Sequence, residues 1–142
     1  MLICDMDAVE QRRCIGTKEI SPVELLESTL ERIEMVNSKV NAIVAMDVDI
    51  ARSEAKIAEQ AVIDGEDLGL LHGLPVGIKD LEATAGLRTT YGSLLYENNV
   101  PDFDDLSVEN VREEGAIILA KTNTPEFGAG ANTRNSVYGA TG

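Results

Sequence analysis

Apolar residues in the first half of the chain recur at the spacing of helices that bury one face. Ser21 can cap a helix, and Glu24 stands three residues later, which is the spacing of a capping box. The apolar positions that follow are three or four residues apart: Val23, Leu26, Leu30 and Ile33. This pattern predicts a helix over residues 22–36.

A second helix is predicted over residues 50–63, where small residues form the apolar stripe. Asp49 can cap its start, and Asp64-Gly65 is a typical stop. The stripe consists of Ala51, Ala55, Ala58 and Val62. Small side chains allow a helix to approach a sheet or another helix closely, so we expect this face to be buried.

Short apolar runs around and after these helices predict strands. They cover residues 42–46, 73–80 and 116–120, and a short helix is predicted over 106–114. Helices that alternate with short strands indicate an α/β fold. Residues 84–93 are rich in Gly and Thr and predict a loop. Residues 121–142 carry few large apolar side chains, and long irregular segments of this kind are usually functional or disordered.

The charge of the chain narrows the classes of partner. The formal net charge is −13, which argues against nucleic acid, because its phosphates are neutralised by Lys and Arg. It argues equally against a basic helix on a membrane surface, and no apolar run approaches the ~20 residues of a membrane span. The first ten residues carry two Asp and no basic stretch, so we expect no signal peptide and a cytoplasmic protein.

The cysteines and the single histidine argue against a disulfide scaffold, a zinc site and a His-rich metal cluster. Cys4 and Cys14 are the only cysteines and lack the Cys-x-x-Cys spacing, and His72 is the only histidine. Gly128-Ala129-Gly130 matches part of a dinucleotide fingerprint, but Thr133 stands where the third glycine belongs. We therefore expect neither a metal nor a cofactor.

Lys79 is the most informative charged residue, because it stands at the end of an apolar strand. Side chains alternate along a strand, so Val76, Ile78 and Asp80 share one face while Gly77 and Lys79 share the other. Gly77 leaves room on its face for a ligand or for a second backbone. The carboxyl end of a strand is also where open α/β sheets place their sites. From these residues alone, Lys79 is either a functional amine or an ordinary surface charge.

Three stretches, in order along the chain, resemble the amidase signature family. They are LGLLHGLPVGIKDLEATAGLRTTYGS at residues 68–93, DDLSVENVREEGAIILAKTNTPEFG at 104–128 and NTRNSVYGATG at 132–142. Residues 19–41 are similar to the N-terminal helices of the same family. The combination of Gly-Leu-Pro-x-x-x-Lys-Asp with Lys-Thr-Asn-x-x-Glu-Phe is specific, and the resemblance covers nearly the whole chain.

Members of this family cleave or transfer carboxylic amides with a serine nucleophile, a bridging serine on a cis peptide bond and a lysine. The resemblance implies that Lys79 is this lysine. The stretch that carries both serines would begin shortly after Gly142 and is not in this sequence. In a complete enzyme the lysine must be neutral to accept a proton, and we expect burial to favour that form there.

The resemblance also assigns roles to residues around this lysine. Gly128, Ala129 and Gly130 match a turn that lies against the amide of a small-molecule substrate, where their backbone N–H and C=O groups would contact it. Three further positions are assigned to structural support: Asp80, Thr122 and Asn123.

The implied fold is the N-terminal, incomplete part of the α/β/α fold of that family, with helices packed on a short mixed sheet. We expect one partial domain in three segments. These are a helical segment at about 1–65, the strand of the catalytic lysine with its α/β continuation at about 66–128, and a tail rich in Gly, Asn and Thr at 129–142. A partial domain would leave apolar strand faces uncovered. We expect the chain to hide them by self-association, or by leaving the Gly-rich tail disordered.

Three hypotheses about activity stay open. In the first, the chain is part of an amidase, or of the corresponding component of a glutamine-dependent amidotransferase, and is inactive alone because Lys79 lacks its serines. In the second, it is a non-catalytic module that binds a partner or the missing half. In the third, it has a chemistry of its own that uses His72 or Cys14.

Overall fold

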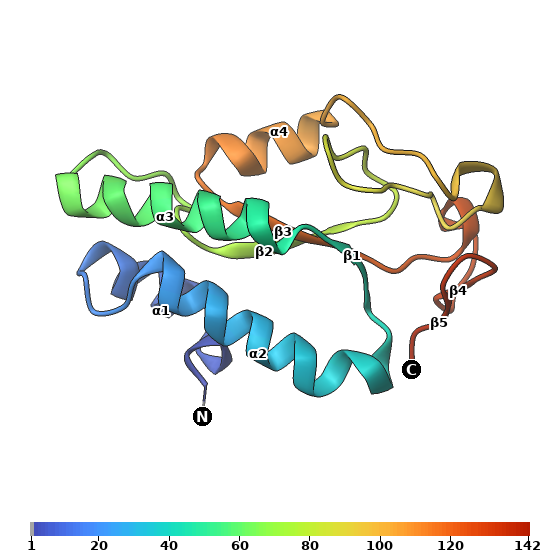
Figure 1. Ribbon diagram of the computed structural model, residues 1–142, viewed down its shortest axis with the longest axis horizontal. Helices are drawn as coiled ribbons and strands as arrows, with labels where there is room; N and C mark the ends of the chain where they lie inside the picture. Colours follow the sequence, from blue (N-terminus) through green and yellow to red (C-terminus); the bar gives the residue numbers. More distant parts are fainter. Residues whose placement is uncertain (1) are drawn as a thin grey trace. The chain divides into compact units, whose positions relative to one another are not determined.

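A computed structural model of the chain describes residues 2–142 and contains helices and strands in alternation, as the α/β prediction requires (Figure 1). The helices are α1 (Ala8–Gly16), α2 (Pro22–Val40), α3 (Val48–Asp64) and α4 (Leu106–Glu113). The strands are β1 (Ile43–Met46), β2 (Pro75–Lys79), β3 (Ile117–Thr122), β4 (Arg134–Asn135) and β5 (Gly139–Ala140). Three short 3-10 turns complete the order: Ile3–Asp5, Leu94–Tyr96 and Glu126–Gly128.

The strands form a mixed sheet of three and a separate pair. The order in the larger sheet is β1-β3-β2, and β1 runs antiparallel to β3 with Ile43 opposite Thr122. The N–H of Ile117 donates to Leu74 O, and the N–H of Asp80 donates to Thr122 O, so β2 and β3 run in the same direction. Strands β4 and β5 form an antiparallel hairpin. The prediction of a short mixed sheet is therefore confirmed.

Helix α2 begins where the capping box predicted and ends later than expected. The N–H of Ser21 donates to the Glu24 carboxylate at 2.8 Å, and the N–H of Glu24 donates to Ser21 Oγ at 3.1 Å. The helix then continues to Val40, past the predicted end at residue 36. Asn37 supports this extra turn, because its Oδ1 accepts the N–H groups of residues 42 and 43.

The buried faces of α2 and α3 agree unequally with the predicted stripes. In α3, the four residues of the predicted stripe are buried, and they are the only buried residues of this helix. In α2, Leu25, Leu26 and Ser28 are buried, whereas the predicted positions other than Leu26 are half-buried. The two helices lie along each other, joined by Arg52 on α3 and Glu27 on α2 at 2.7 Å (Figure 1).

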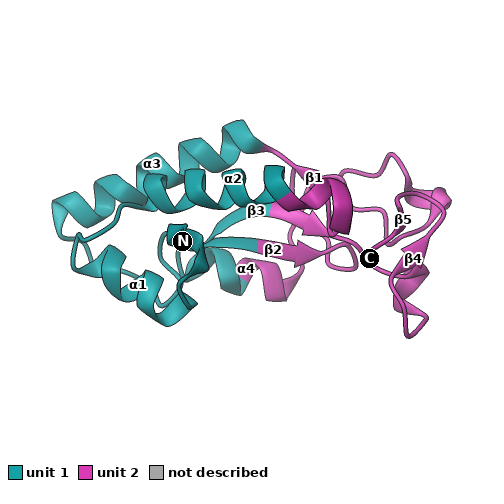
Figure 2. Cartoon of the chain, turned by 90° about the horizontal axis from the view of Figure 1, so that it is seen from below, with its two compact units in different colours: residues 1–35, 48–76, 110–119 teal, residues 36–47, 77–109, 120–142 magenta. Residues whose placement is uncertain are grey.

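Contacts divide the chain into two compact units, each assembled from three separate stretches (Figure 2). Unit 1 contains residues 1–35, 48–76 and 110–119, and unit 2 contains residues 36–47, 77–109 and 120–142. The core of unit 1 is a cluster of apolar side chains: Ile15, Leu25, Val62 and Leu74. The expected division into three consecutive segments stays a prediction.

Unit 2 buries a different kind of side chain. Its buried polar residues are Asp80, Thr84, Thr89, Thr90, Ser93, Lys121, Asn123 and Thr124. In unit 1, Ser28 is the one buried polar residue among those that the structure describes. Hydrogen bonds of buried side chains therefore hold together much of the interior of unit 2, whereas apolar packing does so in unit 1.

Candidate functional site

Lys79 lies at the last position of β2, on the face that the alternation predicted. Gly77 and Lys79 are exposed, whereas Ile78 and Asp80 are buried. Within residues 2–142, the Lys79 ammonium has no hydrogen bond and no ion pair. Burial of Lys79 was expected for the complete enzyme, and within residues 2–142 the side chain is exposed.

Thr122 lies beside Gly77 on the face of Lys79. A Cβ atom at position 77 would stand 3.0 Å from Thr122 Cγ2, so glycine allows the neighbouring threonine to pack closely. The carbonyl of Thr122 accepts the N–H of Asp80 at 2.9 Å and so fixes the backbone directly after Lys79. These contacts agree with a supporting role for Thr122, which stays a prediction.

Asp80 points into the protein and binds the loop that follows β2. Its side chain is fully buried, and Oδ1 accepts the N–H of Thr90 at 3.0 Å. Oδ2 accepts the Thr90 hydroxyl at 2.6 Å. A buried carboxylate needs such donors to offset the loss of water. Asp80 therefore holds Thr90 instead of its sequence neighbour Lys79.

Lys121 is a buried lysine that belongs to the Lys-Thr-Asn-x-x-Glu-Phe motif but was assigned no role from the sequence. Its side chain is fully buried at the end of β3, and Nζ donates to Thr84 Oγ1 at 2.8 Å, to Thr89 Oγ1 at 3.1 Å and to the carbonyl of Glu82. Burial lowers the pKa of Lys121 to about 8, against the opposing effect of the Asp80 charge and three other carboxylates. The three acceptors match the three donors of an ammonium group.

The glycine turn at residues 128–130 contacts the chain just after Lys79. Gly128 has a φ of +73°, which favours glycine, and a Cβ atom there would stand 2.8 Å from Leu81 Cδ1, so the turn packs closely against this side chain. The N–H groups of Gly128 and Ala129 already donate to Pro125 O and Glu126 O. The turn therefore offers a ligand its carbonyls and the N–H of Gly130, which is a smaller set of donors than we expected.

Asn123 connects β3 to the tail, which is ordered in place of the disorder that we considered. Its Nδ2 donates to Thr141 Oγ1 at 3.1 Å, and its Oδ1 accepts from Asn135 Nδ2 at 2.7 Å. Asn41 adds a second tie, because its Nδ2 donates to the carbonyls of Tyr138 and Ala140. Side-chain amides thus hold a segment that has almost no apolar side chains. The assignment of Asn123 to structural support stays a prediction.

Three aromatic rings line the loops around the glycine turn. The rings of Tyr91 and Tyr96 meet edge to face at 5.1 Å, and those of Tyr96 and Phe127 do so at 6.2 Å. Phe127 is 53% exposed and has a φ of +49°, and its N–H donates to Tyr91 O. The contact of Tyr96 with Phe127 joins residues 31 positions apart along the chain, so the sequence gives no local signal for it.

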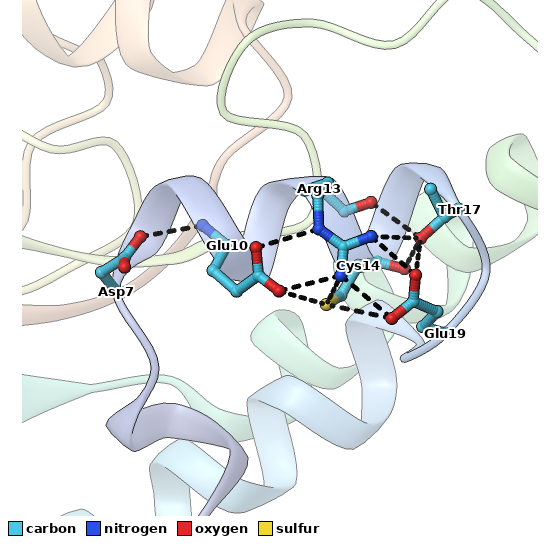
Figure 3. Close-up of polar contacts among 6 residues, drawn as sticks. All are labelled: Asp7, Glu10, Arg13, Cys14, Thr17 and Glu19. Atoms are coloured by element: carbon cyan, nitrogen blue, oxygen red, sulfur yellow. Dashed lines mark hydrogen bonds and ion pairs between the residues drawn. The ribbon is translucent and has the colours of Figure 1, made fainter.

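The Cys14 thiol lies among charged side chains on α1 (Figure 3). Arg13 donates to the carboxylates of Glu10 and Glu19, and Cys14 Sγ lies 3.7 Å from an oxygen of each. Burial raises the pKa of the thiol, and the two carboxylates act in the same direction against the nearby guanidinium. A thiol that stays protonated is a poor nucleophile.

His72 is held by a backbone group. One ring nitrogen, Nε2, lies 2.9 Å from the carbonyl of Ala58 on α3. Cys14 and His72 have no hydrogen bond to each other within residues 2–142. The two residues of the third hypothesis therefore do not form a nucleophile–base pair.

Two features of the described residues concern membranes and metals. None of the helices within residues 2–142 combines the length and the apolar character needed to cross a bilayer. In the same part of the chain, no three His, Cys, Asp or Glu side chains are grouped so that they could hold a metal ion.

Comparisons with known proteins relate the chain to amide-cleaving and amide-transferring enzymes. A family model described as Amidase matches residues 24–142. The A subunit of glutamyl-tRNA(Gln) amidotransferase from Carboxydothermus hydrogenoformans is 41% identical over 133 residues, which are 94% of this chain and 27% of that protein. The same protein from Geobacter sp. (strain M21) is 39% identical, with coverage of 98% and 28%. The chain thus spans a little over a quarter of the length of these curated relatives.

Solved structures give the same result. A bacterial aryl acylamidase of the amidase signature enzymes has a TM-score of 0.89 and 31% identity, with coverage of 96% of this chain and 29% of that one. Fatty acid amide hydrolase has a TM-score of 0.91 at 22% identity, with coverage of 98% and 25%, and this likeness concerns the fold alone.

Proposed function

The chain belongs to the amidase family, and on this premise we propose that it is the N-terminal part of an enzyme that cleaves carboxylic amides with Lys79 as its base. The observation that carries the proposal is the position of Lys79. The amine stands at the carboxyl end of β2, without a carboxylate partner within residues 2–142. Leu81, in the turn that follows the strand, lies against Gly128 of the glycine turn.

The proposed mechanism needs a neutral amine and two serines. In it, Lys79 accepts a proton from a bridging serine, which in turn accepts the proton of the serine that attacks the amide carbon. Those serines are not among residues 1–142 in the context that the family motif requires. We therefore propose that the chain turns over no amide by itself, and that residues outside it would cover the exposed face of Lys79.

A glutamine-dependent amidotransferase is the more specific candidate within this class. The curated relatives that are 38–42% identical are A subunits of glutamyl-tRNA(Gln) amidotransferase. The aryl acylamidase is 31% identical. The higher identity favours glutamine as the amide that would be cleaved. A free amidase and a non-catalytic binding module remain the alternatives.

A chimera tests the proposal. The chain is fused to the part of the Carboxydothermus relative that follows its matching region. Release of ammonia from glutamine and release of the arylamine from an aryl acylamide are then measured. Lys79→Met should lower kcat/KM at least about a hundredfold, because it removes the base. Lys39→Met, at an exposed lysine in the last turn of α2, is the matched control and should retain activity. Equal activity of the two variants would contradict the proposal.

Self-association and a cytoplasmic location also stay proposals. The exposed apolar side chains Leu94, Leu95 and Phe103 in unit 2 support self-association. Both cysteines are free thiols, which is usual in a reducing compartment. Sedimentation of the purified chain over a range of concentrations would test self-association.

A further inference from the structure

Two opposite charges are fully buried behind the candidate site. Asp80 follows Lys79 directly, and Lys121 stands on the neighbouring strand β3. Each is a residue type that is almost never fully buried unless it is paired. Burying a charge costs several kcal/mol if nothing compensates it, so the presence of both signs in one place calls for a physical reason.

The two charges hold the same segment, residues 82–90, and meet at its end, where their partners are consecutive residues. Lys121 binds the carbonyl of Glu82 and the hydroxyls of Thr84 and Thr89. Asp80 binds Thr90, the residue next to Thr89. Consecutive residues therefore bind a buried cation and a buried anion, and the segment that they fix is the one that leaves the strand of Lys79.

The other carboxylates near Lys121 are engaged elsewhere. Asp105 accepts the N–H of Ala83 at 2.6 Å, and Asp104 accepts the N–H of Ala85 at 2.7 Å. Glu82 accepts the hydroxyl of Ser107 at 2.8 Å. None of these three side chains is fully buried. Four carboxylates raise the pKa of Lys121 against the effect of burial, and among them Asp80 raises it most.

The remaining titratable and charged groups near Asp80 do not replace Lys121. Burial raises the pKa of Tyr91 and of Tyr138, so both phenols are neutral at pH 8. The Arg88 guanidinium lies 5.2 Å from the centre of the Tyr138 ring and donates to the carbonyl of Glu97. Lys121 is thus the buried cation on the side of the sheet to which Asp80 points.

We propose that Lys121 is a positioning residue for the amidase site: its buried charge, held by Thr89, offsets the charge of Asp80, held by the next residue Thr90, and so limits the attraction of this carboxylate for the Lys79 ammonium. The proposal rests on the function proposed above for Lys79. An uncompensated carboxylate one residue away would attract the Lys79 ammonium and favour the protonated amine, which cannot accept a proton. With Lys121 present, the negative charge of Asp80 is neutralised on the opposite face of β2.

Trace acetylation of Lys79 at pH 8, measured by mass spectrometry on the purified chain, tests the proposal. Only the neutral amine reacts, so the rate reports the neutral fraction. Lys121→Met keeps the length of the side chain and removes its charge, and it should slow acetylation of Lys79 at least about threefold. The double variant Asp80→Asn, Lys121→Met removes both charges and should restore the rate to within about a factor of two of the wild type.

The control and the contradicting outcomes are defined by the same variants. Lys56→Met removes an exposed lysine on α3 and should leave the rate at Lys79 unchanged. A rate in Lys121→Met equal to or above that of the wild type would show that Lys121 only supports packing, because loosening the loop does not favour the ammonium form. A double variant as slow as Lys121→Met would also overturn the proposal.

A second measurement covers the case in which Lys121→Met does not fold. Removing both charges should then recover folding, and the Tm of the double variant should exceed that of Lys121→Met, because no uncompensated carboxylate remains. A double variant with a Tm equal to or lower than that of Lys121→Met would contradict the pairing. Both measurements use the chain itself and need no amide turnover. An inactive chimera would therefore leave them intact, and their failure would leave the role of Lys79 intact.

Discussion

The two units of the chain differ in the polar side chains that they bury, and the candidate site lies in the unit that buries many of them. Unit 1 closes on Ile15, Leu25, Val62 and Leu74. Unit 2 buries Asp80 and Lys121 together with four threonines, Ser93 and Asn123, beside a smaller set of apolar side chains. Apolar packing is non-directional and tolerates repacking. Hydrogen-bonded networks are directional and fix one arrangement. The comparison suggests that unit 1 supplies stability and that unit 2 supplies the geometry of the site.

The largest loss of stability is expected from a substitution in the apolar core of unit 1. Leu25→Ala removes a fully buried side chain from this core and should lower the free energy of unfolding by about 2–5 kcal/mol. Urea denaturation measures the change. Leu95→Ala, at a position that is 83% exposed, is the control and should change the stability by less than about 0.5 kcal/mol. Similar changes in stability for the two substitutions would contradict the claim that the apolar core stabilises unit 1.

An intermediate and local effect is expected from the amides of unit 2. Asn123→Ala leaves Asn135 Nδ2 and Thr141 Oγ1 without this hydrogen-bond partner. It should lower the free energy of unfolding by about 1–3 kcal/mol. Amide hydrogen exchange should become faster in residues 133–142 and stay unchanged in α3. Asn132→Ala, at an exposed position of the same tail, is the matched control. Faster exchange throughout the chain would contradict the local role of this network.

The smallest effect is expected from the polar contacts of unit 1, which lie at its surface. Hydrogen bonds from Arg13 and Thr17 lower the pKa of Glu19 to about 2, and the Arg13 and Glu19 side chains are both about half exposed. A lowered carboxyl pKa stabilises the folded state above the unfolded value of about 4.5, and this contribution is lost as the pH falls toward 2.

Glu19→Gln tests this pH dependence. The variant should have a slightly lower Tm than the wild type at pH 7, and the difference should disappear near pH 2. A Tm difference that persists at pH 2 would mean that the side chain acts by packing and not by charge. A difference as large as that of Asn123→Ala would show that exposed and buried hydrogen bonds contribute alike.

Local patterns in the sequence predicted helices α2, α3 and α4 and strands β1, β2 and β3, but not the β4–β5 hairpin. Ser21 and Glu24 marked the start of α2 because a capping box is made by residues three apart. The alanine stripe of α3 and the alternation along β2 were confirmed because each depends on one element and its period. Helix α1 fell within the segment expected to be helical, but its apolar pattern was too weak to give its bounds.

The polar interior of unit 2 was beyond such patterns. The predicted strand ended at Ala120, because a lysine after an apolar run usually marks the surface. In the structure, β3 continues through Lys121 to Thr122. Its burial depends on Thr84 and Thr89, which lie more than 30 residues earlier in the chain. The order of the tail likewise depends on Asn41 and Asn123, which no local rule connects to it. Non-local hydrogen bonds decide both features.

The ties between Asn41 and the tail also set a time order for synthesis and folding. The β4–β5 hairpin can close as soon as its own residues are made, but Thr141 Oγ1 donates to Asn41 O across 100 positions of sequence. Contacts of high sequence separation close large loops and slow folding. On the ribosome, Asn41 must wait for nearly the whole of this chain before its last partners arrive. Unit 2, which contains Lys79, is therefore completed long after Lys79 itself has been made.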